Sequence, residues 1–355
     1  MNGPWTIESA AVHRARVRGC LLGGAVGDAL GYPVEFSSLD RIRSTHGRHG
    51  VTGLVPGAHG ATGLVSDDTQ MTLFTVEALI QARAREREKG IGGAWPVLLR
   101  QAYERWLETQ SKPGPEQGGA PTGGLLGELW LYARRAPGNA CLSGIAQLYA
   151  PDPWLELDGK PGQVNPDSKG CGTVMRSAPF GLVNPADAAF AMAARGAQIT
   201  HGHPTGYYAA GALAAIVAHL VAGESLEGAV LRTLRLLARY PGHQETTAAL
   251  EQALDLASEG MPTAEKLETL GAGWVAEEAL ALAVYCALAE PGVERALLLS
   301  VNHSGDSDST GSLCGNLLGA LHGDVGLPHA WVRRVEGRAV IAALAEDLAA
   351  ESVRG

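Results

Sequence analysis

The amino-acid sequence predicts an all-α protein built as a single domain. Ala and Leu, two of the strongest helix formers, dominate long segments of the chain. Stretches that alternate β-branched and polar residues are almost absent, so strands should be rare. No composition shift or linker divides the 355 residues, and the helix-favouring composition continues to the end of the sequence. We therefore expect one domain over residues 1–355.

Two rows of glycine predict a pair of closely packed helices. The glycines recur at every fourth residue, as Gly19, Gly23, Gly27 and Gly31 and as Gly311, Gly315, Gly319 and Gly323. A glycine inside a helix costs about 1 kcal/mol relative to alanine. A four-residue spacing can offset this cost because it forms a smooth ridge that another backbone can approach. Glycine-rich loops are the alternative, but the intervening Leu, Ala and Val favour helices in the core that place nearby acidic residues.

Nine further segments rich in Ala and Leu are expected as helices. They span 67–88, 95–110, 186–199, 207–222, 225–240, 244–258, 274–289, 293–301 and 337–350. The apolar run 207–223 is 17 residues long and includes His219. It is short for a membrane span, so we interpret it as a buried helix.

Two long loops are expected between these helices. Residues 111–124 are built largely of Pro and Gly, and residues 151–172 carry Trp154 and several aspartates. Loops of this length in a compact domain are usually either functional or disordered. The first can be a surface excursion as readily as a functional loop. The second leads directly into "TVMRSAPFGL", and we expect it to be functional.

Charge and cysteine content exclude several classes of protein. A net charge of −9 and a pI near 5.7 argue against stable nucleic-acid binding. The apolar run near the N-terminus is broken by Asp28 and shows no clear cleavage site, so we expect no export. The five cysteines are scattered without a CxxC pair, which favours reduced thiols and a cytoplasmic protein. They are Cys20, Cys141, Cys171, Cys286 and Cys314.

The stretch "NHSGDSDSTG" (302–311) indicates a divalent metal site. Asp306 and Asp308 are separated by a single residue, and their carboxylates should repel one another unless a cation lies between them. An EF-hand would need Glu at position 12 of the loop, where Leu317 stands. A DxDxT phosphatase would need a preceding strand and a later lysine, but none of the 44 residues after Gly311 is lysine.

A second acidic cluster begins the expected helix over 67–88. Ser66, Asp67 and Asp68 precede an apolar run, and Thr69 follows them. Such residues often cap a helix N-terminus, where they accept backbone N–H bonds and favour the positive end of the dipole. One aspartate would be enough for a cap. Two adjacent aspartates between hydroxyl groups also fit ligands of a hard cation, and both interpretations stay open.

Five motifs in order resemble the ADP-ribosylglycohydrolase family. They are "GCLLGGAVGDALGYPVEF" (19–36), "SDDTQMTL" (66–73), "KGCGTVMRSAP" (169–179), "THGHP" (200–204) and "NHSGDSDSTGSLCGNLLGALHG" (302–323). The resemblance covers most of the chain. It implies an orthogonal all-α helical bundle around a binuclear magnesium centre, in which manganese could also bind.

The resemblance also implies a role for particular residues. Metal ligands would come from two sides of the centre, as Ser66, Asp67 and Asp68 and as Asp306, Asp308 and Ser309, with Thr310 as a rival to Ser309. Glu35 would be the general acid or base, and Asp67 or Asp68 would share this role. The alternative for Glu35 is a residue that only holds metal-bound water. The ADP-ribose would contact Ser168, Lys169, Gly170, Cys171, Gly172 and His201. The family often has Asn at the position of Cys171 and Thr at those of Ser66 and Ser309.

The implied activity is hydrolysis of the bond between ADP-ribose and a modified acceptor. Its transition state carries oxocarbenium character, which calls for nearby negative charge and a positioned water. Magnesium suits ligands that are carboxylates and hydroxyls, whereas "HGH" (201–203) lacks further His or Cys at zinc-ligand spacing. The alternatives are a hydrolase of another ribosylated small molecule, a non-catalytic ADP-ribose-binding relative, and a structural protein built on the same fold.

The acceptor is expected to be ADP-ribosyl-arginine in protein. The two long loops carry several carboxylates that would favour a cationic acceptor, namely Glu116, Asp152, Glu156, Asp158 and Asp167. Serine-linked and nucleic-acid-linked ADP-ribose are the alternatives. We expect the protein to act as a monomer, without a membrane.

Overall fold

The computed structural model describes residues 7–57, 60–90, 92–115 and 124–354. Within these residues it contains helices and two isolated β-bridges, and no strand. The longer helices are α1 (Ile7–Gly31), α3 (Asp67–Lys89), α4 (Trp95–Thr109), α7 (Ala186–Ala197), α8 (Pro204–Val221), α9 (Leu226–Leu237), α10 (Gln244–Ala257), α12 (Ala276–Ala289), α13 (Val293–Val301), α14 (Ser307–His322) and α16 (Arg338–Arg354).

Short helices complete the bundle. The α-helices among them are α2 (Leu39–His46), α5 (Asn139–Ile145), α6 (Ala178–Val183), α11 (Ala264–Leu267) and α15 (His329–Val332). The 3₁₀ helices are η1 (Tyr32–Val34), η3 (Gly124–Gly127), η4 (Leu129–Leu131), η5 (Cys171–Thr173), η6 (Glu268–Leu270) and η7 (Asp324–Gly326). The all-α prediction is confirmed, and each expected long helix is present within a few residues of its expected ends. The short helices were missed because one or two turns give too little hydrophobic periodicity to recognise.

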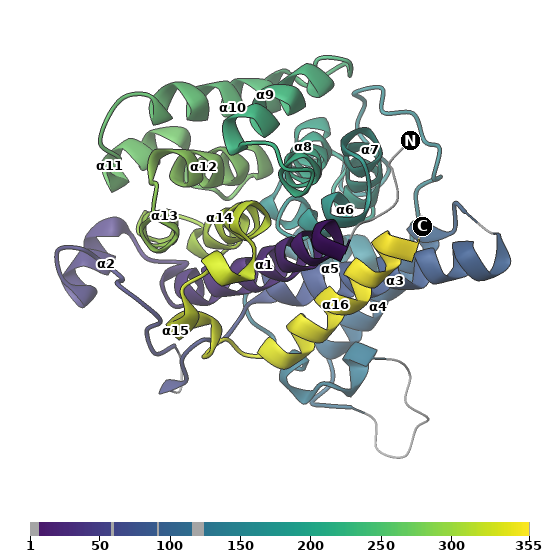
Figure 1. The fold of residues 1–355 in the computed structure, drawn as a ribbon, viewed down its shortest axis with the longest axis horizontal. Helices are drawn as coiled ribbons and strands as arrows, with labels where there is room; N and C mark the ends of the chain where they lie inside the picture. Colours follow the sequence, from purple (N-terminus) through teal and green to yellow (C-terminus); the bar gives the residue numbers. More distant parts are fainter. Residues whose placement is uncertain (1–6, 58–59, 91, 116–123, 355) are drawn as a thin grey trace.

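Helices α1 and α14 lie together at the middle of the molecule. In Figure 1 the helices α8–α12 lie on one side of this pair, and α3, α4 and α16 lie on the other. The apolar helix α8 is long and hydrophobic enough to cross a membrane, but 89% of it is buried inside the protein. It therefore packs as a core helix, as its sequence predicts.

The glycine rows form the contact between α1 and α14. A Cβ atom at Gly23 would lie 2.2 Å from the carbonyl oxygen of Gly315, and one at Gly27 would lie 1.9 Å from that of Gly311. Gly19 meets Gly319 in the same way. The two backbones therefore touch, as the spacing predicts. Gly323 differs from the other seven glycines because it ends α14 with a φ of +72°.

This contact positions the ends of three chain segments. α1 passes through η1 to Glu35, and α14 begins directly after Asp306. Asp28, fully buried in α1, accepts hydrogen bonds from the backbone N–H of Ser66 at 2.9 and 3.0 Å and of Thr69 at 3.1 Å. It therefore caps the N-terminus of α3 and fixes it against α1.

The two expected loops differ in how far the structure describes them. Residues 116–123 of the first loop, including Glu116, lie outside the described residues. The second loop, residues 151–172, consists of turns and bends until η5 begins at Cys171. Its Trp154 is 80% exposed and lines a cavity of about 360 Å³ beside α3, α4 and α7.

The glycine contact makes a prediction about stability. Alanine in a helix interior is normally more favourable than glycine by about 1 kcal/mol. We expect Gly23→Ala to do the opposite and to lower the free energy of unfolding by about 1–3 kcal/mol, because the new methyl group overpacks the contact with α14. Urea unfolding measures the difference.

Gly127→Ala is the matched control. Gly127 lies in η3, where a Cβ atom would have no neighbour within 4 Å. We expect this variant to unfold at nearly the wild-type urea concentration. Equal stability of Gly23→Ala and Gly127→Ala would contradict a close helix contact.

Candidate metal centre and active site

A cavity of about 450 Å³ opens where the end of η1 and the starts of α3 and α14 meet. Five buried carboxylates line it: Glu35, Asp67, Asp68, Asp306 and Asp308. Ligand oxygens of Glu35, Asp306 and Asp308 all lie within 4.8 Å of one another. The structure therefore brings together acidic residues from three distant parts of the chain.

The carboxylates of the cavity have few partners that would offset their negative charge. Three buried oxygens have no hydrogen-bond partner, namely Glu35 Oε2, Asp68 Oδ1 and Asp306 Oδ2. Among the described residues that line the cavity, none is lysine or arginine. Burial, followed by the neighbouring Asp308, raises the pKa of Glu35 to about 11. Burial and the same neighbour also raise the pKa values of Asp67, Asp68 and Asp306 well above their ordinary values.

A divalent cation would relieve both the repulsion and the unsatisfied oxygens. The donors gathered at the end of η1 and at the starts of α3 and α14 are carboxylates and the Ser309 hydroxyl, which suit a hard cation such as magnesium. Burial and the acids Asp306 and Asp68 raise the pKa of the Cys171 thiol well above its ordinary value, so it stays protonated beside them. A protonated thiol is a poor metal ligand. The residues present therefore fit a hard cation better than a thiophilic one.

At the start of α3, one residue caps the helix and the next two face the cavity. Ser66 is the N-cap, and its hydroxyl accepts a hydrogen bond from the Asp68 backbone N–H at 3.2 Å. Ser66 does not line the cavity, whereas Asp67 and Asp68 do. The Asp67 carboxylate accepts a long hydrogen bond of 3.4 Å from the Gly138 N–H. Capping thus falls to Ser66 and Asp28, and both adjacent aspartates are left facing the cavity.

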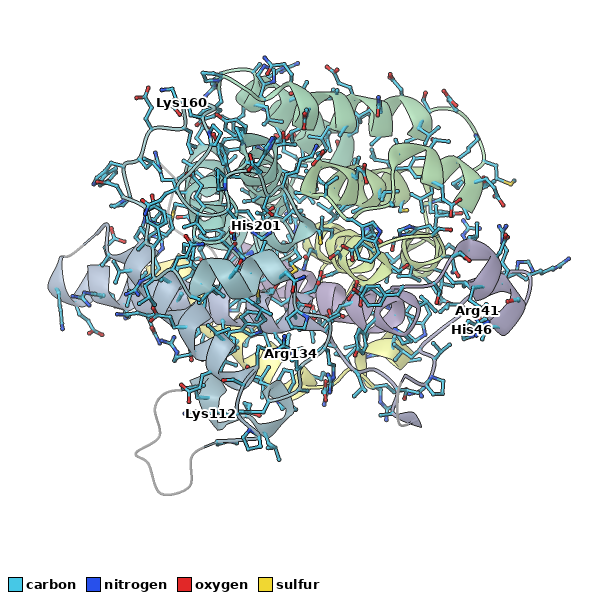
Figure 2. All side chains as sticks on the ribbon, turned by 180° about the vertical axis from the view of Figure 1, so that it is seen from behind. Arg41, His46, Lys112, Arg134, Lys160 and His201 are labelled. Atoms are coloured by element: carbon cyan, nitrogen blue, oxygen red, sulfur yellow. The ribbon has the colours of Figure 1, made fainter. Side chains whose placement is uncertain are left out.

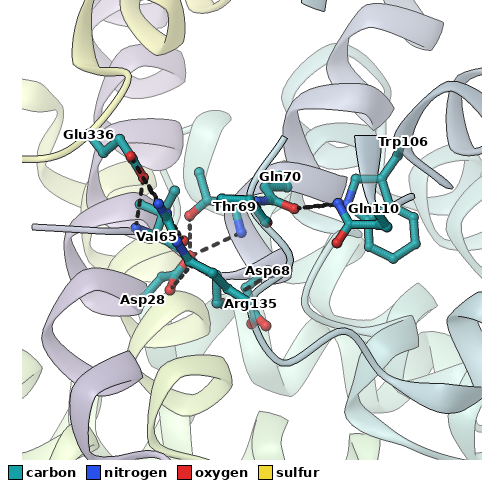
Figure 3. Close-up of polar contacts among 11 residues, drawn as sticks. Asp28, Val65, Asp68, Thr69, Gln70, Trp106, Gln110, Arg135 and Glu336 are labelled. Atoms are coloured by element: carbon teal, nitrogen blue, oxygen red, sulfur yellow. Dashed lines mark hydrogen bonds and ion pairs between the residues drawn. The ribbon is translucent and has the colours of Figure 1, made fainter. Parts of the chain in front are cut away.

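A polar network holds the chain around this start (Figure 3). Arg135 donates to the Val65 carbonyl oxygen at 2.6 Å and pairs with Glu336. On the other side, the Gln70 Oε1 atom accepts from Trp106 Nε1 at 3.1 Å and from Gln110 Nε2 at 3.0 Å. These contacts fix the backbone immediately before and after Asp67 and Asp68. The two aspartates are therefore presented to the cavity by a rigid support.

The start of α14 distinguishes Ser309 from Thr310. Ser309 lines the cavity, and its backbone N–H donates to Asp308 Oδ1 at 3.0 Å. Thr310 is fully buried, and its hydroxyl bonds to the carbonyl oxygens of Ser300 at 2.7 Å and Asp306 at 2.9 Å. Ser309 is therefore the hydroxyl placed to act as a ligand.

Most of the expected ADP-ribose contacts also line the cavity. They are Ser168, Gly170, Cys171, Gly172 and His201. The backbone lies close to its neighbours here, since a Cβ atom at Gly172 would lie 2.6 Å from Cys141 Sγ. His201 is buried inside the molecule (Figure 2). Burial and the nearby Arg176 lower its pKa to about 3, so its imidazole is neutral.

Lys169 differs from the other residues of that set. It is absent from the cavity lining, and its ammonium group pairs with Glu245 at 2.8 Å and with Glu277. The motif identified the segment, but it could not show that this side chain points away from the cavity.

Asp28, Phe36 and Trp274 are among the residues of the site that the sequence did not predict. The sequence indicated Asp28 only as the charge that interrupts the apolar run near the N-terminus, although it caps α3 and burial raises its pKa to about 7. Phe36 and Trp274 both line the cavity, and their rings stack with centroids 5.6 Å apart. No pattern in the sequence around either aromatic residue predicts that its ring stacks on the other, because the two lie far apart in the chain.

Comparison with known proteins agrees with this geometry. The sequence model of a family described as ADP-ribosylglycohydrolase matches residues 9–355. An ADP-ribosyl-[dinitrogen reductase] glycohydrolase of Rhodospirillum rubrum is 26% identical, over 95% of this chain and 93% of that protein. An ADP-ribosylhydrolase of Mus musculus is also 26% identical, over 96% of this chain and 92% of that protein.

One further relative and one solved structure extend the comparison. An ADP-ribosylarginine hydrolase of Serratia proteamaculans is 24% identical, over 96% of this chain and 80% of that protein. A solved structure described as an ADP-ribosylglycohydrolase-related protein complex shares the fold, with a TM-score of 0.67 and 24% identity, over 96% of this chain and 99% of that one. Because the family model covers nearly the whole chain, this protein belongs to the ADP-ribosylglycohydrolase family and is an ADP-ribosyl hydrolase.

Proposed function

We propose that this protein is a magnesium-dependent hydrolase that removes ADP-ribose from ADP-ribosyl-arginine in proteins. The observation that carries the proposal is the cavity lined by five buried carboxylates, three of which have an oxygen without a partner. A non-catalytic ADP-ribose reader would have no need to keep so many costly buried acids. Their retention supports a catalytic role.

The ligands of the centre would come from two sides. Asp67 and Asp68 would hold cations from the start of α3, and Asp306, Asp308 and Ser309 would hold them from the start of α14. When bound, two divalent cations would orient the ribose hydroxyls and activate water. The caps made by Asp28 and Ser66 keep the ligating side chains in place.

Glu35 is the residue that we assign to proton transfer. It lies 6% exposed at the cavity wall, close to Asp306 and Asp308. Its raised pKa keeps the carboxyl group protonated in the metal-free protein, so it can carry a proton. Positive charge between the aspartates would lower this pKa, because an opposite charge favours the ionised form. The same group could then take a proton from water or give one to the leaving nitrogen.

The glycine-rich turn at Gly170 and Gly172 would contact ADP-ribose through its backbone. A side chain at Gly172 would collide with Cys141, so only the main chain can come this close to the cavity. The neutral imidazole of His201 lies beside it, where it can make a hydrogen bond without adding charge. Ser168 lines the same wall.

An arginine acceptor is supported by the charge of the site and by the relatives. The cavity lining is strongly acidic, which favours a cationic acceptor. A relative from Serratia proteamaculans is named an ADP-ribosylarginine hydrolase. The loop carboxylates add less negative charge at the acceptor side than their number predicts. Asp158 pairs with Lys160, and Asp167 lines an adjacent cavity instead. The acidity that matters therefore lies in the cavity itself.

Magnesium should stabilise the folded protein through the acidic cluster. At a magnesium concentration a hundred times Kd, linkage gives about 2.7 kcal/mol of stabilisation. We expect calorimetric melting to show this shift in the wild type and its loss in the Asp306→Asn/Asp308→Asn double variant. A double variant that keeps both the shift and EDTA-sensitive activity would disprove the ligand assignment.

The same melts should depend on pH in a defined direction. The carboxylate pKa values are raised on folding, so the metal-free protein loses stability as pH rises through these values. The buried histidines have lowered pKa values, so they reduce stability only below about pH 6.5. Between about pH 7 and pH 8.5 we therefore expect the magnesium-induced shift to increase, since fewer protons compete with the cation.

Replacement of Glu35 tests its role in proton transfer. We expect Glu35→Gln to reduce the rate of hydrolysis by at least about 100-fold, a typical loss for a general acid or base. Calorimetry should show ADP-ribose binding close to the wild-type affinity. A variant that loses binding and activity together would show that Glu35 holds the site in shape and does not transfer the proton.

Side-by-side assays test the acceptor. We expect ADP-ribose release from arginine-linked substrate, with much slower release from serine-linked and nucleotide-linked substrates. EDTA should abolish the release from arginine. Rapid release from serine or a nucleotide, with arginine untouched, would remove arginine from the proposal and leave only the hydrolase.

A further inference from the structure

Two exposed aromatic rings stand at the wall of the acidic cavity. Phe36 is 75% exposed and Trp274 is 40% exposed, and the planes of their rings are 18° apart. Both residues line the same cavity as the carboxylates. Large rings are normally buried, so a stacked pair left in water beside a binding cavity suggests that a ligand covers it.

The segment that carries Trp274 is fixed in place on two sides. The Trp274 carbonyl oxygen accepts a hydrogen bond from the Cys171 N–H at 3.1 Å, and the Ala272 carbonyl oxygen accepts one from the Asp306 N–H at 2.9 Å. The Glu278 carboxylate accepts from the backbone N–H groups of Ala272 at 2.9 Å and Gly273 at 3.1 Å. The backbone that carries the indole is therefore held between Asp306 and the glycine-rich turn.

Phe36 is fixed by its position in the chain. It directly follows Glu35, and the next residue, Ser37, donates its backbone N–H to the Val34 carbonyl oxygen at 2.9 Å. Glu35 and Phe36 line the same cavity, so a group that rests on the Phe36 ring lies in the cavity that the Glu35 carboxyl group also lines. If Glu35 transfers the proton, that group is the part of the substrate that leaves.

The charge of the cavity decides which group fits the rings. Five carboxylates line it, no lysine or arginine is among its described lining residues, and His201 is neutral. A planar cation gains from both features, since a guanidinium group stacks on aromatic faces and is attracted by the surrounding acids. Adenine would also stack, but it gains nothing from the negative charge.

We propose that Phe36 and Trp274 form a stacking surface for the guanidinium group of the acceptor arginine. This inference rests on the proposed function and names the residues that select its acceptor. The rings act as positioning residues, because they would touch the leaving side of the substrate without exchanging a proton. They should affect arginine recognition and leave the binding of ADP-ribose itself unchanged.

The test compares ring-removing and ring-keeping variants. We expect Phe36→Leu and Trp274→Leu each to raise KM for ADP-ribosyl-arginine about fivefold, as the loss of one cation–π contact predicts, with kcat within about twofold of wild type. Phe36→Tyr and Trp274→Phe keep a ring and should restore the wild-type KM. Calorimetry with free ADP-ribose and magnesium should give the same Kd for all four variants.

Trp154→Leu is the matched control. It removes an exposed indole that lines a separate cavity beside α3, α4 and α7, so its KM should stay at the wild-type value. Melting temperatures of all five variants establish that they are folded. A KM that rises equally in Trp154→Leu would contradict a specific role for the pair.

Three other results would overturn the inference. An unchanged KM in both Leu variants would show that the rings do not touch the acceptor. A weakened Kd for free ADP-ribose would show that they hold the nucleotide instead. A wild-type enzyme that cleaves serine-linked and not arginine-linked ADP-ribose would refute the proposed acceptor before any variant is compared. Failure of the proposed acceptor can therefore be distinguished from failure of the aromatic stacking surface.

Discussion

The direct backbone contact between α1 and α14 is the constraint on which the rest of the structure depends. Because glycine faces glycine along both helices, the two backbones approach more closely than any side chain would allow. Glu35 follows α1 through η1, and Asp306 and Asp308 stand at the start of α14. Asp28, on α1, then caps α3 and brings Asp67 and Asp68 to the same place. One packing contact thus assembles a site from three segments that are distant in the sequence.

The assembled site is electrostatically unfavourable without a cation. Five carboxylates share one cavity, and their pKa values rise because burial and mutual repulsion both penalise the charged form. Such a cost persists in a protein when it serves a function. In the proposed function, the same carboxylates that destabilise the metal-free protein would hold cations beside the ribose, and this would couple stability and activity through the occupancy of the centre. The aromatic pair at Phe36 and Trp274 lines the same cavity and is the surface that we propose for the acceptor arginine.

Much of the fold and of the buried acidic cluster could be predicted from the sequence, because the signals are local. Helices such as α3 and α12 are rich in residues that favour helices, and the glycine rows have a fixed spacing. The paired aspartates are adjacent in one cluster and separated by one residue in the other. The rest depends on tertiary structure. The direction of the Lys169 side chain, the choice of Ser309 over Thr310, and the capping of α3 by Asp28 follow from packing between distant segments. The stacking of Phe36 on Trp274 likewise joins two segments that no short pattern connects.

Anomalous diffraction from crystals soaked in manganese tests the metal centre most directly. We expect anomalous peaks inside the cavity between the start of α3 and the start of α14, with carboxylate oxygens of Asp67 or Asp68 and of Asp306 or Asp308 at about 2.0–2.3 Å. Manganese bound only elsewhere on the protein, with the cavity carboxylates unliganded at saturating concentration, would contradict it.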